Sequence, residues 1–259
     1  MLLLDSKLDA FWESFSFLSD CSLEVKLPTC STTSKVDTSS AYVSEGRLIV
    51  PGAGLSFDTA CFKEIYASAS PAKLSMISEH RRLALSFTLE DESMRQKFGY
   101  FAKAFALDTV PDDFQLESPV APHLCPCCMD AAKYRVKNLA QNPLTCILDH
   151  AAGLHYPLVV SLRNADGQMM TSHTPVHLKR QGGRLISEGR DNQFQIDITH
   201  LHAMRLNEVR LDGVPHISLA LYNSRGEKNC SISAVSFDMA NTWQTILDNK
   251  NHCYEMIEP

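Results

Sequence analysis

The chain has 259 residues, of which 44% are hydrophobic and 21% are charged. That size and composition allow a substantial core, arranged as one large domain or two small ones. The formal net charge of -6 gives no overall basic field that would attract nucleic acid. Basic residues occur only as pairs such as Arg81–Arg82 and Lys179–Arg180, so we expect no nucleic-acid partner.

The compartment is predicted from the first residues and the cysteines. The start, Met-Leu-Leu-Leu-Asp, turns acidic at once and lacks the basic region of a signal peptide. No run approaches the roughly 20 apolar residues that a membrane helix needs. These features predict a cytoplasmic protein without membrane insertion, in which most of the 9 cysteines remain free thiols.

The first half of the sequence predicts strands between two helices. Asp9–Leu18 and Ser93–Leu107 carry aromatic residues at helical spacing. Pro28–Ser40 is rich in Ser and Thr, which is typical of a loop or a weak strand pair. Alternating or short apolar patterns predict strands at Cys21–Leu27, Gly46–Val50, Leu55–Cys61, Leu74–Ile77 and Leu83–Leu89.

A linker with Pro and Asp residues, Asp108–Pro126, leads into the second half. Helices are expected at Cys127–Leu139 and Leu144–Ala151, and a closing helix at Asp238–Leu247. Strands are expected between them, with turns at Asn164–Gly167, Gly182–Gly183 and Gly213: Tyr156–Leu162, Leu178–Ile186, Phe194–Ile198, Val209–Leu211, Ile217–Tyr222 and Ile232–Val235.

The two halves come into register when the chain is shifted by about 137 positions. Gly46-Arg-Leu-Ile49 then falls on Gly183-Arg-Leu-Ile186, and Phe57 falls on Phe194. Lys73-Leu74 would match Arg210-Leu211, and Leu83–Leu89 would match Ile217–Leu221 after a slip of two or three residues. Any two β meanders share a periodicity, but here a four-residue identity and the order of helices coincide in one register.

This repeat predicts an α+β fold with two similar antiparallel β-sheet units and flanking helices. We expect the first repeat to occupy residues 1–107 and the second residues 144–259. Residues 108–143 would form a linker and a helix that carry a His/Cys cluster.

The order of elements in Leu144–Leu247 resembles that of the bacterial haem-utilisation and hemin-degrading factors typified by HemS, ChuS, ChuX and HutX. The most similar segment is Gly183–Asn223, which ends in Ile217-Ser-Leu-Ala-Leu-Tyr-Asn and a polar turn. The resemblance implies a duplicated fold, haem as cofactor, and a cytoplasmic role in haem utilisation and iron acquisition. A haem importer or a haem-accepting protein would then be a partner.

The sequence departs from that family at two places. The two-copy relatives usually carry a ligand histidine in a Val-His-x-Phe-Phe-like stretch before the second unit, where this chain has only His123 in a comparable place. They also tend to have a Gly-x-Arg element after the polar turn, where this chain reads Cys230-Ser-Ile-Ser-Ala-Val. The resemblance therefore implies haem binding with a different ligand geometry, or a fold from which haem binding has been lost.

The linker cluster, His123-Leu-Cys-Pro-Cys-Cys128, carries the candidate ligands of a metal. Haem iron accepts an axial histidine or a cysteine thiolate, which makes His123 and Cys125 candidates. Structural zinc normally has four ligands in spaced pairs, and the donors here are packed more tightly than that. Cys125 and Cys128 have Cys-x-x-Cys spacing, but the βαβ context of a thioredoxin is absent. A surface loop without function is the further alternative.

The histidines gather in the second half, because nine of the 10 lie at or after His123. His155, which begins a predicted strand next to Tyr156, and His202 are the other candidate iron ligands. Arg205 and Arg210 could pair with haem propionates. Each of these residues could equally be an ordinary polar residue at a sheet edge.

The sequence thus favours a haem carrier, storage protein or degradation factor, and leaves open whether it is an enzyme. A regulatory or interaction protein that keeps the fold without haem is one alternative. A metal- or thiol-dependent enzyme that uses the cysteine cluster is another.

Overall fold

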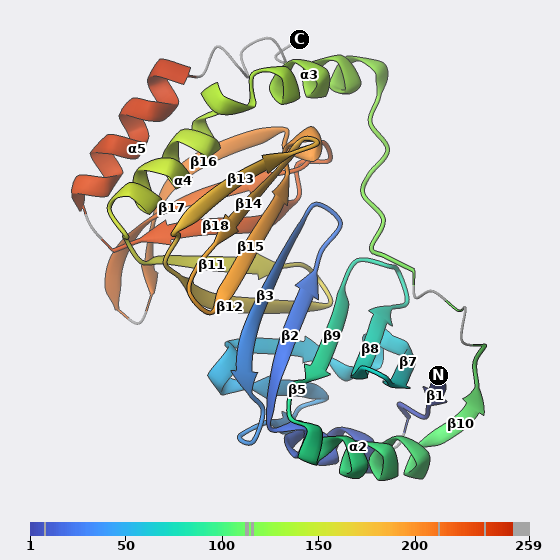
Figure 1. Cartoon of the computed structure of the whole chain (residues 1–259). Helices are drawn as coiled ribbons and strands as arrows, with labels where there is room; N and C mark the ends of the chain where they lie inside the picture. Colours follow the sequence, from blue (N-terminus) through green and yellow to red (C-terminus); the bar gives the residue numbers. More distant parts are fainter. Residues whose placement is uncertain (8, 112–113, 115–116, 212, 236, 251–259) are drawn as a thin grey trace. The chain divides into compact units, whose positions relative to one another are not determined.

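The computed structural model describes residues 1–7, 9–111, 114, 117–211, 213–235 and 237–250. The chain forms two compact units (Figure 1). Unit 1 comprises Met1–Pro28, Thr32–Val120 and Arg163–Met170, and unit 2 comprises Thr29–Ser31, Ala121–Leu162 and Thr171–Pro259. Each half of the sequence therefore lends a short segment to the unit that the other half builds. Among the described helices, none has both the length and the hydropathy needed to span a bilayer.

Unit 1 contains two sheets and the helices that cover them. Its larger sheet has the strand order β10-β1-β7-β8-β9-β2-β3, and its smaller sheet has the order β4-β5-β6-β12. The bounds are β1 Leu2–Leu4, α1 Asp9–Glu13, η1 Ser14–Leu18, β2 Asp20–Lys26, β3 Cys30–Asp37, β4 Tyr42–Ser44, β5 Arg47–Val50, η2 Pro51–Ala53, β6 Leu55–Asp58, η3 Thr59–Cys61, β7 Phe62–Ala69, β8 Ala72–Ser78, β9 Ala84–Leu89, α2 Glu92–Ala104 and β10 Ala106–Thr109.

Unit 2 repeats this design with three α-helices. Its strands lie in the orders β13-β14-β15 and β16-β17-β18-β11, and α4 and α5 pack side by side (Figure 1). The bounds are α3 Pro126–Lys137, η4 Leu139–Gln141, α4 Pro143–Gly153, β11 Leu158–Arg163, β12 Gly167–His173, β13 His177–Gln181, β14 Arg184–Glu188, β15 Asn192–Asp197, η5 Ile198–His200, β16 Ala203–Leu211, β17 Val214–Tyr222, β18 Lys228–Ala234 and α5 Phe237–Lys250.

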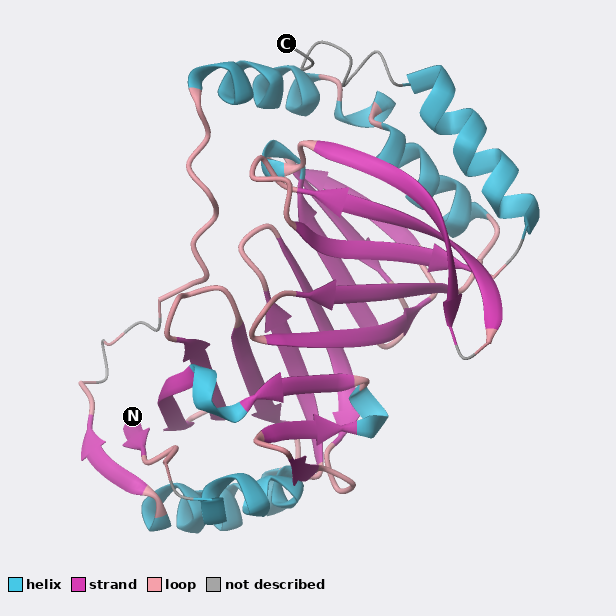
Figure 2. Ribbon diagram, turned by 180° about the vertical axis from the view of Figure 1, so that it is seen from behind, coloured by secondary structure: helices cyan, strands magenta, loops and turns pink. Residues whose placement is uncertain are grey.

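Local sequence explains where the helices begin and which face they bury. Asp91 caps α2 by accepting a hydrogen bond from the Ser93 amide at 2.8 Å, and Asn142 caps α4 in the same way. Phe101 of α2 is buried and stacks with Phe11 of α1, with ring centroids 5.6 Å apart. Trp243 of α5 is fully buried in unit 2. Strands are the main secondary structure of both units (Figure 2).

The duplication predicted from the sequence is confirmed by the order of the elements. In the first half a short helix is followed by β2, β3, β4, β5, β6, η3, β7, β8, β9 and α2. In the second half α4 is followed by β11, β12, β13, β14, β15, η5, β16, β17, β18 and α5. Apart from the 3-10 turns η1 and η2, which occur only in the first half, every element of one series has a counterpart of the same type in the other. The fold is therefore α+β with two similar antiparallel units.

The predicted register of the two repeats is correct at the Gly-Arg-Leu-Ile segments from which it was taken. Arg47 and Arg184 occupy the same place at the start of β5 and β14, facing Asp58 and Asp197 across the hairpin. Phe57 and Phe194 also lie on equivalent strands, β6 and β15. They are two positions out of step, however, because β14 and β15 each contribute one more paired residue than β5 and β6 before a turn of the same length.

Farther along the chain the predicted register is wrong. Lys73-Leu74 lies on β8, whereas Arg210-Leu211 lies on β16, the counterpart of β7. Ile217–Leu221 lies on β17, so it corresponds to β8 and not to β9. A strand pattern has a period of two residues, so sliding one hairpin onto the next loses few hydrophobic matches.

Several strands were missed or underestimated by the sequence prediction. Pro28–Ser40, expected as a loop or a weak strand pair, contains the eight-residue strand β3. Its buried face includes Thr32 and Ser34, so the alternation is one of burial and not of hydrophobicity. The prediction for β16 covered only its end, Val209–Leu211. No strand was predicted at β1, β4, β7, β10 or β12.

The segments exchanged between the halves are held by backbone pairing. In unit 1, Gly167 pairs with Phe57 and Met169 with Leu55 in antiparallel register. The Asn164 side-chain amide donates a hydrogen bond to the Arg82 carbonyl at 2.8 Å. In unit 2, the Asp197 amide donates to the Thr29 carbonyl at 2.8 Å. Each unit therefore completes a sheet with backbone from the other half of the sequence.

A substitution at Gly54 tests the contact between the first-half strands of unit 1 and the second-half segment Arg163–Met170. It has a φ of +56°, and a Cβ added there would lie 2.3 Å from the Met170 carbonyl oxygen. We expect Gly54→Ala to lower the free energy of unfolding by about 1–3 kcal/mol. Chemical denaturation measures this change.

Gly99→Ala is the matched control, because Gly99 lies in α2 and an added Cβ meets nothing within 4 Å. Alanine in a helix interior should raise stability by about 0.5–1 kcal/mol. Equal stability of the Gly54→Ala variant and the unmodified protein would contradict the packing of Arg163–Met170 in unit 1.

Candidate functional site

The cysteine cluster lies where the linker enters unit 2. Cys125 is the N-cap residue of α3, and Pro126 occupies the first helical position, where its fixed φ suits the start of a helix. His123, Cys125 and Cys127 are exposed, whereas Cys128 is buried. The helix therefore fixes one sulfur against the unit and leaves the other two facing solvent.

The three sulfur atoms form one compact group. The Cys125 and Cys127 sulfurs are 2.8 Å apart, and those of Cys125, Cys127 and Cys128 all lie within 4.8 Å of one another. All three residues are free thiols. The prediction had assigned a ligand role to His123 and Cys125, and had noted the Cys-x-x-Cys spacing that brings Cys128 beside Cys125 in a helix, but it had not joined Cys127 and Cys128 to the ligand set.

Hydrogen bonds within this group shift the pKa values of Cys125 and Cys128 in opposite directions. Donation from the Cys127 thiol, together with donors of Cys128, lowers the pKa of Cys125 to about 7. The Cys128 thiol donates to Cys125 and is also buried, and both effects raise its pKa to about 11. Cys125 thus carries substantial thiolate character at neutral pH, and the thiolate is the form that binds metals and reacts.

Arg135, which the sequence analysis did not single out, fixes α3 to the rest of unit 2. It is 2% exposed, and its guanidinium donates hydrogen bonds to the carbonyls of Ile198 at 3.3 Å and Thr199 at 3.1 Å. Cys128, Ala132 and Arg135 form the buried stripe of α3. In the sequence, the helical spacing of Arg135 from the small residues Cys128 and Ala132 is the signal that could have identified Arg135 as a buried residue.

His202 lies next to this anchor. It follows η5 and is half-buried, and burial, together with the Arg135 guanidinium, lowers its pKa. The imidazole is therefore neutral at pH 7, the state in which histidine binds metals. Of the candidate ligands outside the linker, His202 is the one that the structure associates with α3.

The remaining candidates lie in less specific surroundings. His155 is exposed at the end of α4, with a left-handed backbone φ of 48°. Arg205 and Arg210 are both exposed on β16, and their odd spacing places them on opposite faces of that strand. They therefore cannot both hold one ligand from the same face of the sheet.

His173 belongs to a buried cluster of hydrogen-bonded polar side chains in unit 2. One ring nitrogen lies 2.6 Å from the Asn192 amide oxygen, and the other lies 2.7 Å from the Ser187 hydroxyl. The order Ser-His-Asn is that of a nucleophile with its base, but Ser187 is 0% exposed and His173 is 1% exposed. No substrate can reach the hydroxyl, so the group is structural.

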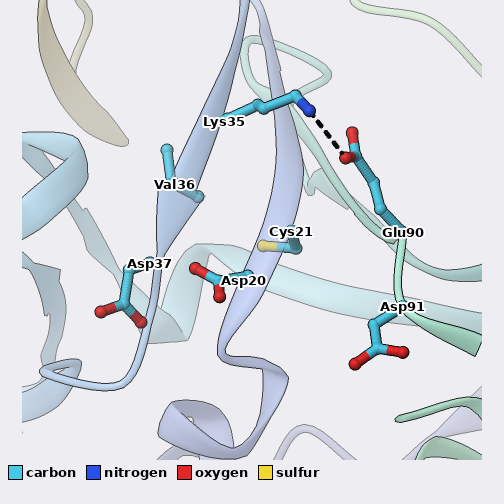
Figure 3. Close-up of a pocket in the computed structure, with 7 residues that line it drawn as sticks. All are labelled: Asp20, Cys21, Lys35, Val36, Asp37, Glu90 and Asp91. Carbon is cyan, nitrogen blue, oxygen red and sulfur yellow. Dashed lines mark hydrogen bonds and ion pairs between the residues drawn. The ribbon is translucent and has the colours of Figure 1, made fainter. Parts of the chain in front are cut away.

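Unit 1 contains a pocket of about 380 Å³ with an acidic lining. Figure 3 shows the carboxylates of Asp20, Asp37, Glu90 and Asp91 around it, with Lys35 ion-paired to Glu90 at 3.0 Å. Asp37 and Asp91 accept hydrogen bonds from Ser39 and Ser93, two residues after each of them. These two carboxylates therefore serve local turns and caps.

The sequence matches no protein-family model, and no curated protein matches it. Its structure is similar to that of apo-PhuS, a haem-binding protein from Pseudomonas aeruginosa, with 13% identity and a TM-score of 0.69 over 96% of this chain and 86% of that one. Holo-PhuS gives 12% identity and a TM-score of 0.70 over 94% and 86% of the two chains.

A second similar structure is ChuS, an Escherichia coli haem oxygenase. It has 8% identity and a TM-score of 0.66, over 96% of this chain and 88% of that chain. The chain has the fold of PhuS and ChuS. The two-copy architecture thus extends over nearly the whole length of both molecules, which confirms the fold that the resemblance implied.

The lowered pKa of Cys125 predicts a fast-reacting thiol. We expect one cysteine of the native protein to be alkylated quickly by iodoacetamide, with a rate that is half-maximal near pH 7. Cys125→Ser should remove that phase, and Cys146→Ser, at a half-exposed cysteine of α4, should not. A fast phase that survives in Cys125→Ser would contradict the assignment.

The burial of His173 predicts that the folded protein loses stability in acid. Burial lowers its pKa in the folded protein, so the unfolded chain, with a histidine pKa of about 6.5, binds more protons below that pH. The free energy of unfolding should therefore decrease as the pH falls through about 6.5 towards the folded pKa. His173→Gln should reduce this dependence in denaturation series at several pH values.

His80→Gln is the control for that measurement, because His80 is exposed in unit 1. A pH dependence that is the same in His173→Gln and the unmodified protein would show that His173 does not carry it.

Proposed function

We propose that this chain is a cytoplasmic haem-binding protein of haem and iron utilisation, acting as a carrier, a storage protein or a degradation factor. The observation that carries the proposal is the fold. It matches the haem-binding protein PhuS and the haem oxygenase ChuS over 94–96% of this chain. The cysteine cluster at the start of α3 adds independent support, because haem iron accepts a thiolate.

The linker supplies the favoured axial ligand, either His123 or Cys125. Both residues are exposed ahead of α3, and the lowered pKa of Cys125 makes its thiolate available at neutral pH. The neutral His202 and the exposed His155 are the alternative ligands. When bound, the haem would supply the iron centre that carries any oxygen chemistry, and the protein would hold and orient it.

Charge favours unit 2 over unit 1 for this ligand. Haem carries two propionates, which need cationic partners. The pocket of unit 1 is lined by four carboxylates and a single lysine that is already paired, so its field opposes a dianionic ligand. In unit 2, Arg205 and Arg210 are exposed on β16, and one of them can reach a propionate from a given face.

The exposure of the linker ligands also bears on the role. A ligand such as His123 or Cys125 that lies at the surface can be replaced by a ligand of another protein without opening a core. This arrangement suits transfer, and we include in the proposal that a haem importer or a haem-accepting protein is a partner.

Hemin titration tests the proposal. We expect saturable 1:1 binding with a shifted Soret band. The double variant His123→Ala/Cys125→Ser should weaken binding by at least tenfold, which is the loss of about 1.4 kcal/mol, and should move the Soret maximum. The control His80→Ala/Cys146→Ser, which alters the same two residue types elsewhere, should leave both unchanged.

The outcomes separate the ligand from the function. No saturable binding by the unmodified protein would refute haem binding. Binding that is unaffected in the double variant would move the ligand to His202 or His155, which His202→Ala and His155→Ala would then identify. Loss of the Soret band after addition of a reductant in air would assign degradation, and its persistence would assign carriage or storage.

A further inference from the structure

Three thiols at the start of α3 meet the geometric requirement of a metal site that does not involve haem. Two sulfurs bound to one ion at about 2.3 Å each lie no more than about 4.6 Å apart. The sulfurs of Cys125, Cys127 and Cys128 already lie within 4.8 Å of one another. Closing on a single ion therefore needs the exposed Cys125 and Cys127 sulfurs, which are 2.8 Å apart, to separate by about 1 Å, to the roughly 3.8–4.0 Å between two sulfurs of a tetrahedral or trigonal site.

We propose that Cys125, Cys127 and Cys128 together bind one thiophilic d¹⁰ cation, Cu(I) or Zn²⁺, as a three-thiolate site. Thiolate ligands select these ions among the metals available to a cell. The inference rests on the cluster alone and does not depend on haem binding.

The scaffold is already arranged for such an ion. Cys128 is buried on the stripe that packs α3 onto unit 2, and Arg135 of the same stripe is hydrogen-bonded to Ile198 and Thr199. Cys125 and Cys127 are exposed and closer to solvent. One ligand is thus held rigidly, and two can move onto the ion.

Electrostatics at the helix start favours the charged form of the site. The N-terminus of α3, a 12-residue helix, carries a partial positive charge that stabilises thiolates. Binding of a cation by thiolates displaces thiol protons, so we expect it to release protons to solution. The 2.8 Å between the Cys125 and Cys127 sulfurs exceeds the roughly 2.05 Å of a disulfide bond, so the thiols remain available.

Three protein ligands fit an exchangeable ion better than a structural one. Structural zinc sites are closed by four protein ligands, whereas sites with three leave a position open. An open position at the protein surface allows an incoming ligand to bind the ion before the protein releases it. The site would accept trigonal Cu(I) directly, or Zn²⁺ with a solvent-derived fourth ligand.

The test is a competition titration of the reduced, full-length protein without hemin and without oxygen. Cu(I) is delivered from a bathocuproine complex, and Zn²⁺ is delivered against a chromophoric chelator in a separate series. We expect 1:1 binding of at least one ion, with proton release in weakly buffered solution. Cys127→Ser and Cys128→Ser should each weaken binding by at least tenfold, and Cys146→Ser should leave it unchanged.

Cys127 is exposed, so Cys127→Ser should fold even if Cys128→Ser does not. Failure of both ions to bind 1:1, or equal affinity of Cys127→Ser and the unmodified protein, would overturn the proposal. Hemin titration of Cys127→Ser separates the two hypotheses: haem binding should persist there while metal binding is lost.

Discussion

The close approach of Gly167 to Phe57 is the contact on which unit 1 depends most directly. A Cβ at Gly167 would lie 2.8 Å from the Phe57 Cβ and 3.1 Å from Leu83, so the strand pair can form only because the residue has no side chain. Phe57 is fully buried and makes edge contacts with Trp12 and Phe62. The segment from the second half is therefore joined to the aromatic core that the first half builds.

This exchange of segments makes the two halves of the sequence structurally dependent on each other. Unit 1 takes Arg163–Met170 and unit 2 takes Thr29–Ser31, so neither half of the sequence carries all the strands of its own unit. Either half of the sequence without the other would lack that pairing partner and would leave a sheet with an unpaired backbone edge, which costs free energy when buried. Duplication supplied two similar units, and the exchange makes each depend on the other half.

In unit 2 the buried Arg135 holds the candidate site in place, as the contact at Gly167 holds the strand pair of unit 1. Arg135 attaches α3 to the carbonyls of η5 and so fixes the helix whose first turn carries the cysteines. Because His202 lies beside the same guanidinium, one side chain influences both the placement of the thiols and the charge of a histidine. The candidate ligands are thus connected through a packing residue that cannot bind a metal itself.

The sequence predicted the parts of this structure that depend on local patterns. Gly46-Arg-Leu-Ile and its copy identified equivalent hairpins, and the aromatic spacing of Phe98 and Phe101 identified α2. The strand exchange was not predicted, because Gly167, which the pairing with Phe57 requires, was interpreted in the sequence as the end of a turn. For the site, His123 and Cys125 stood out by residue type. Arg135 and the grouping of three sulfurs required the geometry of a folded helix.

The measurement that tests the central claim most directly is a crystal structure of the protein with hemin bound. The account predicts that the iron is bound by a residue of the linker cluster, His123 or Cys125, and that a propionate faces either Arg205 or Arg210 of unit 2. A haem bound in unit 1, in the acidic pocket of Asp20, Asp37 and Glu90, would contradict it.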